Sequence, residues 1–439
     1  MYCVQGVLPI MNVQEHEALT VPGYSPDVLV NSPQLDSHFS SNETLQMPTP
    51  PIRQPVIERI HLRYIDGIRA LAALYVVISH MWLEVWPVFY QQSPTGLLYT
   101  LTGWMAYAHV AVSVFIVVSG FSLTIPVVRN GGRFKQGWNG FLVRRARRIL
   151  PTYYLAIAFC LVLIWTCVGQ KTGTHWDLSV PITWRDVWLH IFLIQDATST
   201  AGINHAFWSI GVEWRIYLLF PLLVVIQRRF GVGATLAVGI CSSAIYLLYF
   251  ERLTPNNPWL SDGFSGIPFT YFTLFILGMV GATIAFSANS RLRIMCAAIP
   301  WHLLTVVSGI SLILIIYWWR TGGILALSFA QWACIDLVTG VFATSLLVLG
   351  VQSKESLVHT ICGWRPLAFV GTFAYSIYLI HAPLIQVVWQ YLLHPLHLGG
   401  TATLCGLLLV GIPFIVGVSY LFFWIGERPF ITKEKTVTA

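Results

Sequence analysis

The chain has 439 residues, of which 56% are hydrophobic and 10% are charged, and its mean hydropathy is +0.68. This balance lies outside the range of soluble globular domains and excludes that class. The formal net charge of +7 does not indicate a nucleic-acid partner, because the basic residues lie in short links between apolar segments, where membrane topology explains them. The composition therefore predicts an integral membrane protein, with the lipid bilayer as a partner.

The chain begins with a polar segment, residues 1–58, that is rich in Pro, Ser, Asn and Gln and has no sustained apolar period. Such a segment cannot bury enough apolar surface to fold alone, so we expect a disordered tail. It has no basic start followed by an apolar stretch, which argues against a cleaved signal peptide. The rest of the chain divides into a transmembrane domain, 59–430, and a short tail, 431–439.

Long apolar segments follow one another through this domain. They do not alternate as the strands of a barrel do, and about 20 helical residues cross a hydrocarbon core of roughly 30 Å. Residues 185–195 are too short to cross and predict an interfacial or re-entrant helix. We therefore predict an all-α polytopic bundle of about ten transmembrane helices, near residues 69–88, 104–126, 150–168, 208–227, 232–250, 267–286, 301–319, 331–350, 368–392 and 402–425.

The distribution of Lys and Arg predicts the orientation of these spans. Ten spans place both ends of the chain on one side, and 20 of the 25 Lys and Arg residues lie in the tails and links on that side. Cytosolic links of membrane proteins carry this excess, so we predict that the N- and C-termini are cytosolic. The sequon at Asn42 would then stay unglycosylated. The choice between an endomembrane and the plasma membrane stays open.

The first predicted span contains an ionisable side chain, His80. It follows Arg69 by eleven residues, about 16 Å along a helix, and so lies near the middle of the membrane. An ionisable group at that depth is costly unless it faces a cavity or a partner, and a neutral imidazole is suited to remove a proton from a hydroxyl. The alternative is a neutral histidine that only hydrogen-bonds between helices. His381 lies at a similar depth in the ninth span, where core packing and a site role are both open.

The fourth span carries two further charged residues, Glu213 and Arg215. Entering from the outer face, it places them roughly 8 to 11 Å below the surface. Their i, i+2 spacing directs them to different faces of the helix, so we expect each to have its own partner. The alternative role is an interhelical salt bridge that only fixes packing. His109, His190 and His205 lie near the outer ends of spans, where either a substrate or solvent would meet them.

A basic stretch, FLVRRARRILP at 141–151, precedes the third span. Arg145 and Arg148 are three residues apart and Arg144 and Arg148 four apart, so on a helix they share a face. Their forked guanidinium groups suit phosphate oxygens. Anchoring by the positive-inside effect, or contact with anionic lipid, explains the same arginines.

The eight cysteines form no CxxC pair, and no spacing of histidines or carboxylates is typical of a metal site. We therefore expect neither a disulfide framework nor a bound metal.

Taken in chain order, six motifs resemble those of the acyltransferase-3 family of integral-membrane O-acyltransferases. Bacterial members often carry a second histidine or a second acidic residue where this chain has Met81 and Trp214, which is closer to the fungal style of these enzymes. The motifs lie between about residues 61 and 430 and read YIDGIRALAALYVVISH, VSVFIVVSGF, RRARRILPTYYLA, FWSIGVEW, YSIYLIHAP and GERPF.

The resemblance implies an enzyme that moves an acyl group, commonly acetyl, from acyl-coenzyme A to a hydroxyl of a glycan, a lipid-linked sugar or a small natural product. It implies catalytic roles for His80, Arg69 and Glu213. Coenzyme phosphates would be held by Arg144, Arg145 and Arg148. Residues that bind substrate or support the site would be His381, Trp208, Ser119 and Asp66.

A proton-coupled secondary transporter is the main alternative, since buried His and Glu residues also form proton relays. Transporters often show two matching halves, and the chain has no convincing internal repeat. For an enzyme, acceptor specificity would lie in the outer link 169–207. There Trp176, Trp184 and Trp188 would either stack on a sugar or polycycle or form an interfacial belt.

Overall fold

The computed structural model describes residues 62–87, 93–196, 200–248, 269–319, 327–353 and 355–431, all within the compact unit Ile60–Ala439. The predicted tail 1–58 and residues 432–439 lie outside the described residues.

The described residues form helices and connecting segments, without strands. In the described part of the chain, eight helices are long and apolar enough to cross a membrane, or nine when a bent helix pair is counted as one span. The chain is thus a multi-pass membrane protein, and the predicted all-α bundle is confirmed. The main elements are α1 (Arg63–Val85), α3 (Ala108–Arg129), α4 (Gly137–Leu163), α6 (Trp208–Leu248), α8 (Phe269–Phe286), α10 (Trp301–Trp319), α11 (Phe329–Gln352), α14 (Ala374–Val388) and α16 (Ile412–Phe422).

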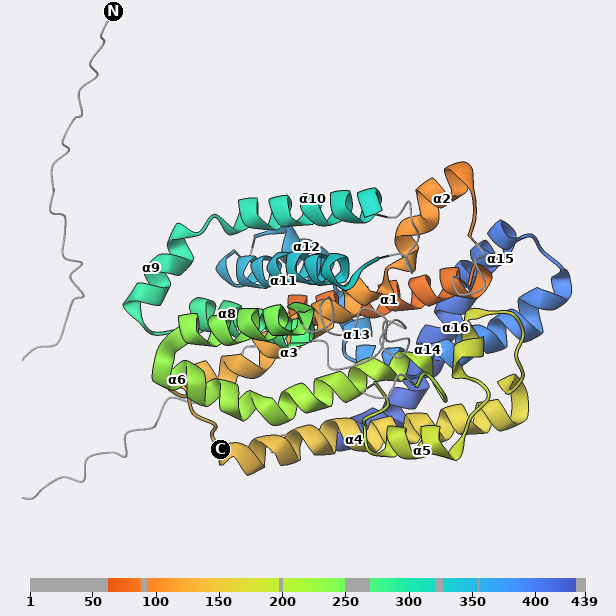
Figure 1. Cartoon of the computed structure of the whole chain (residues 1–439), viewed down its shortest axis with the longest axis horizontal. Coiled ribbons are helices and arrows are strands. Elements are labelled where there is room, and N and C mark those ends of the chain that lie inside the picture. Colours follow the sequence, from red (N-terminus) through yellow and green to blue (C-terminus); the bar gives the residue numbers. More distant parts are fainter. Residues whose placement is uncertain are drawn as a thin grey trace, which may run out of the picture. The chain divides into compact units, whose positions relative to one another are not determined.

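The count differs from ten mainly because α6 is one element of 41 residues with a break inside it. Gly231 has φ 86° and ψ 178°, a conformation that glycine adopts without the steric cost of a Cβ atom. The helix folds back at this point, and its two arms are the predicted fourth and fifth spans (Figure 1). The bent pair is α8 with α9 (Ser290–Ala298), which meet at an angle of 106°.

Two predicted spans have different boundaries. The third begins at Gly137 rather than near residue 150, with Pro151 inside the helix, because hydropathy marks the edge of the apolar layer and not the end of a helix that continues beyond it. The predicted span 368–392 is split into α13 (Arg365–Gly371) and α14. The short helix expected at 185–195 is α5 (Trp184–Ile191).

Helix α1 packs against α3, α13, α14 and α12 (Leu357–Cys362). Glycines allow some of these close approaches: a Cβ atom at Gly67 would collide with the backbone carbonyl of Cys362. In the same way, a Cβ atom at Gly120 of α3 would collide with the backbone of α8, and a Cβ atom at Gly278 of α8 would collide with the backbone of α3. Small residues at such positions let helices approach closely within a membrane. Because α1 is surrounded, the polar side chains along it contact several helices.

Helix α10 packs against α11 at one edge of the bundle (Figure 1). Its other face exposes large apolar side chains, among them Leu303, Val306, Ile313 and Leu314. An exposed apolar surface of this kind is unfavourable in water and suits contact with lipid chains.

Candidate functional site

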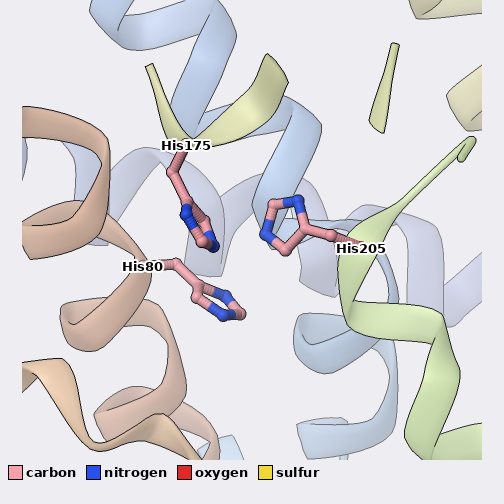
Figure 2. Close-up of side chains that lie close together, drawn as sticks. All are labelled: His80, His175 and His205. Atoms are coloured by element: carbon pink, nitrogen blue, oxygen red, sulfur yellow. The ribbon is translucent and has the colours of Figure 1, made fainter. Parts of the chain in front are cut away.

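Four histidines from distant segments meet near one end of α1. His80 comes from α1, His175 from η4 (His175–Ser179), His205 from η6 (His205–Phe207) and His381 from α14. The ring centroid of His80 lies 5.5 Å from that of His175, 4.9 Å from His205 and 4.9 Å from His381. Figure 2 shows the rings of His80, His175 and His205 turned toward a common space.

His80 and His381 form a direct hydrogen bond. Nδ1 of His80 lies 2.6 Å from Nε2 of His381, and the two rings are parallel to within 2°. Nδ1 of His381 lies 2.7 Å from the carbonyl oxygen of Tyr378, which can only accept, so that nitrogen carries a proton. The Nε2 atom of a neutral His381 is then the acceptor, and His80 donates through Nδ1. This assignment from the hydrogen-bond network leaves the Nε2 lone pair of His80 free.

The other two histidines belong to the outer link, where His205 is buried and His175 is half-buried. His205 is 6% exposed, and its Nδ1 lies 3.0 Å from the hydroxyl oxygen of Ser179. Burial, followed by the electrostatic interaction with His381, lowers the pKa of His175 to about 4, so this imidazole is neutral at physiological pH. His190 is fully buried as well. The expectation that His190 and His205 could be solvated is therefore wrong.

His80, His175 and His205 are the residues that could hold a transition metal, since each offers a ring nitrogen and these nitrogens lie within 4.8 Å of one another. Nitrogen ligands around tetrahedral zinc are closer, roughly 3.3 Å apart from the usual Zn–N distance. The sequence-based expectation of no metal rested on local spacing, which cannot detect ligands from three separate segments.

A second polar group surrounds Arg69, about 16 Å from His80 along α1. Its guanidinium forms an ion pair of 3.1 Å with Asp66 and donates to the hydroxyl of Ser122 at 3.1 Å. Arg69 also interacts electrostatically with Arg148. The predicted motif residues Arg69 and His80 therefore lie in two different parts of the bundle and have different partners.

Glu213 belongs to this second group and does not contact His80. It accepts a hydrogen bond of 3.1 Å from Ser119 and another from Tyr217, and it interacts electrostatically with Arg145 and Arg69. Arg215, two residues later, instead forms an ion pair with buried Asp196. The two charges have separate partners, as their spacing predicted.

The three arginines predicted to bind phosphates differ in their surroundings. Arg145 interacts electrostatically with Arg148, Arg69 and Glu213, and its Nε is buried without a hydrogen-bond partner among the described residues. Arg148 is exposed. Arg144 is also exposed and donates to the side chain of Gln136, so no interaction among the described residues joins it to the other two.

A third polar pair lies beside the predicted residue Trp208. Nε2 of His109 in α3 lies 2.9 Å from the carboxylate of Asp336 in α11, which also accepts a hydrogen bond of 2.6 Å from Ser113. Trp208 stacks on His109 with ring centroids 6.1 Å apart. Trp208 therefore contacts the histidine of this pair.

The tryptophans of the outer link are not equivalent. Trp176 is fully buried and donates from its indole to the carbonyl of Val168 at 2.8 Å, so it neither reaches a substrate nor forms an interfacial belt. Trp184 and Trp188 are 80% and 57% exposed and stand one turn apart on α5, opposite the buried residues Asp186 and His190.

A family model described as an acyltransferase domain matches residues 62–424. The chain belongs to the acyltransferase-3 family. The matched residues contain all three polar groups described above. No solved structure matches the chain.

Curated relatives in bacteria include O-acetyltransferases. The chain is 24% identical over 355 residues to a putative peptidoglycan O-acetyltransferase of Bacillus subtilis, covering 74% of this chain and 49% of the relative. It is 22% identical over 349 residues to the O-acetyltransferase OatA of Staphylococcus aureus, covering 75% and 52%. The acyltransferase MdmB of Streptomyces mycarofaciens is 25% identical over 339 residues, covering 74% and 80%. The chain thus spans about half the length of the first two relatives.

Sequence reasoning had no basis for choosing His175 or Asp336. Neither lies in a quoted motif, and both depend on partners from distant segments. Glu427 was detectable, because it stands in the GERPF motif. It is 1% exposed, accepts a hydrogen bond of 2.7 Å from Ser376 and interacts electrostatically with Arg148.

Proposed function

We propose that this acyltransferase moves an acyl group, in the first place acetyl, from acyl-coenzyme A to a hydroxyl of an acceptor. The acceptor classes we propose are a glycan, a lipid-linked sugar or a small natural product. The names of the bacterial relatives support O-acetyl transfer, and the family match supports an enzyme over a proton-coupled transporter. The observation that carries the chemical proposal is the hydrogen bond between His80 and His381.

His80 is the proposed general base. Its Nδ1 proton is committed to His381, so the lone pair on Nε2 is available to a hydroxyl. No hydrogen bond from the described residues occupies that atom. The hydroxyl oxygen attacks the thioester carbon while its proton passes to Nε2 of His80. Collapse of the tetrahedral intermediate breaks the carbon–sulfur bond, and the proton returns from His80 to the departing thiolate.

Arg145 and Arg148 are the proposed partners of the coenzyme phosphates. Neither forms an ion pair with a carboxylate among the described residues, and the buried Nε of Arg145 lacks a hydrogen-bond partner there. A phosphate oxygen would satisfy that donor. Arg144, which shares the basic stretch, would contribute by long-range attraction. Arg69 would orient the donor together with Asp66, while Glu213 and Ser119 would support the arginines from α6 and α3.

This arrangement implies that the donor enters from the arginine side of the bundle, the end where Arg69, Arg145 and Arg148 lie. Its thioester would then reach the histidines about 16 Å farther along α1. We propose that the arginine side is cytosolic, because most Lys and Arg residues occupy links on that side. On the same ground, the tails 1–58 and 431–439 would be cytosolic. His381 would position His80, and Trp208 would border the acceptor.

Purified protein in liposomes, given acetyl-coenzyme A with an isotope label in the acetyl group, tests this proposal. Cell extracts that still contain the native acceptor supply candidate hydroxyl compounds. Mass spectrometry then identifies the compounds that gain the label. The account predicts a labelled ester that depends on the protein. Label that accumulates inside the liposomes without ester formation would support the transporter instead.

A further inference from the structure

His205 presents a buried nitrogen for which the described residues provide no partner. The residue is 6% exposed, and its Nε2 atom is inaccessible to solvent and forms no hydrogen bond among the described residues. An unsatisfied polar atom in such a place costs stability. The ring stands edge-on to His80, with centroids 4.9 Å apart and an interplanar angle of 85°. An acceptor atom that enters the histidine group would supply the missing partner.

Ser179 determines which nitrogen of His205 carries the proton. The backbone N–H of His205 donates to the Ser179 hydroxyl oxygen at 3.0 Å, and the same oxygen lies 3.0 Å from Nδ1 of His205. Ser179 is fully buried, and the described residues offer its hydroxyl proton no other acceptor. The hydroxyl therefore donates to Nδ1, which leaves the proton of the neutral ring on Nε2.

His80 and His205 thus present opposite hydrogen-bonding groups, an acceptor and a donor, to the space between them. The free Nε2 of His80 is a lone pair, because Nδ1 donates to His381, whereas the free Nε2 of His205 is an N–H donor. Ring nitrogens of these two residues lie within 4.8 Å of each other. A base and a hydrogen-bond donor that face one space can address two oxygen atoms bonded to one carbon.

We propose that His205 is a further catalytic residue, which donates its Nε2–H to the carbonyl oxygen of the acyl thioester. This inference rests on the proposed function. As the acceptor oxygen attacks the carbonyl carbon, the carbonyl oxygen becomes an oxyanion and its hydrogen bond to His205 strengthens. His80 holds the proton of the acceptor at that moment. When the thiolate leaves, the carbonyl double bond forms again and His205 keeps its proton throughout.

The same contacts make His205 a poor metal ligand. A metal ion would need the lone pair of Nε2, which requires the other tautomer and leaves the buried Ser179 hydroxyl without an acceptor. A bound zinc ion would therefore contradict the assignment of an N–H donor. Metal analysis of the purified protein distinguishes the two cases without an activity measurement: the inference predicts less than stoichiometric zinc, and one zinc per chain that His205→Ala removes would overturn it.

Thiol release from acetyl-coenzyme A measures the kinetic effect, with water and octyl glucoside as probe acceptors. His205→Ala should lower kcat by about 10²- to 10³-fold, the usual effect of losing one oxyanion donor, with the KM for acetyl-coenzyme A little changed. His205→Gln retains an N–H donor and should recover part of the loss. His190→Ala is the matched control, because it also removes a buried imidazole whose Nε2 has no partner among the described residues, and we expect near wild-type rates. Equal losses in the Ala and Gln variants, at unchanged thermal stability, would overturn the inference.

A dithioester analogue of acetyl-coenzyme A tests the contact with the carbonyl oxygen itself. Sulfur accepts hydrogen bonds weakly, so the wild-type protein should prefer the oxygen compound, and His205→Ala should reduce this preference at least tenfold. An unchanged preference in a His205→Ala protein would overturn the role of His205 while leaving the proposed function intact. Absence of thiol release by the wild-type protein would contradict the proposed function, and this inference with it.

Discussion

Nδ1 of His80 and Nε2 of His381 are 2.6 Å apart, although 301 residues separate them in the chain. Helices α1 and α14 pack against each other and bring the two rings together. Since Nδ1 of His381 donates to the carbonyl of Tyr378, the nitrogen that carries the proton is determined in both rings. The hydrogen bond makes the half-buried His80 a base of defined orientation. Partners of catalytic and metal-binding histidines commonly have this role.

Removing the acceptor of this hydrogen bond should reduce the rate of transfer. We expect His381→Ala to lower kcat by roughly 10- to 100-fold, as for other partners that orient a histidine, with KM little changed. His381→Gln keeps a side-chain oxygen that can accept from His80 and should retain more activity. Steady-state kinetics of both variants checks this, and a Gln variant as slow as the Ala variant would show that His381 only fills space.

The arginine proposal predicts an effect on donor binding. Arg145→Ala combined with Arg148→Ala should raise the KM for acetyl-coenzyme A by roughly 10- to 100-fold, because each removes a charge-assisted hydrogen bond to phosphate. Arg147→Ala is the control: Arg147 is an exposed residue of the same stretch, and its removal deletes one of the two charges that the double variant loses. If the control raises KM as much as the double variant does, the arginines act as topology anchors.

The close approach of α1 to α12 predicts a stability effect. Gly67→Ala places a methyl group against the backbone carbonyl of Cys362, where backbone must move, and should destabilise the protein by about 1 to 3 kcal/mol. Gly233→Ala in α6 meets no atom within 4 Å and should be neutral or slightly stabilising. Thermal unfolding in detergent compares the two. A Tm for the Gly67 variant equal to that of the wild type would contradict the observed packing.

The lowered pKa of His190 makes the stability of the folded protein depend on pH. Burial lowers the pKa of His190 to about 4, whereas an unfolded histidine titrates near 6.5. Below pH 6.5 the unfolded chain binds a proton that the folded chain excludes, so this contribution to stability is complete above that pH and is lost as pH falls toward 4. Lowering the pH from 7 to 5.5 should cost about 1 kcal/mol through this residue.

Unfolding of wild type and His190→Gln at both pH values isolates this contribution. The variant should lose less stability on acidification than the wild type by that amount. Identical losses would show that His190 is protonated in the folded protein.

The sequence predicts the membrane-spanning architecture well, because long apolar segments have few structural alternatives to spanning helices. It also predicts the break between two spans near Gly231, where charged and small residues interrupt the apolar run. It does not predict that α4 begins at Gly137, since a helix that leaves the membrane keeps its hydrogen bonding while its side chains become polar.

The candidate site could be predicted only in part. His80, His381 and Glu213 were recognisable one by one, because ionisable residues within apolar runs are costly. Their pairing was not, since it depends on how α1, α6 and α14 pack. Glu213 interacts with Arg69 and Arg145. His80 instead contacts His381 and two residues of the outer link, His175 and His205. That link has no periodicity from which a buried position could be inferred.

The proposed role of His80 can be tested with one comparison, single-turnover transfer of labelled acetyl by the wild-type protein and by His80→Ala in liposomes. Both proteins must first show the same thermal unfolding and the same binding of coenzyme A. If the Nε2 atom of His80 takes the acceptor's proton, the variant should bind the donor normally and form labelled ester at least about 10²- to 10⁴-fold more slowly. Ester formation by the variant at the wild-type rate would show that another group performs the proton transfer.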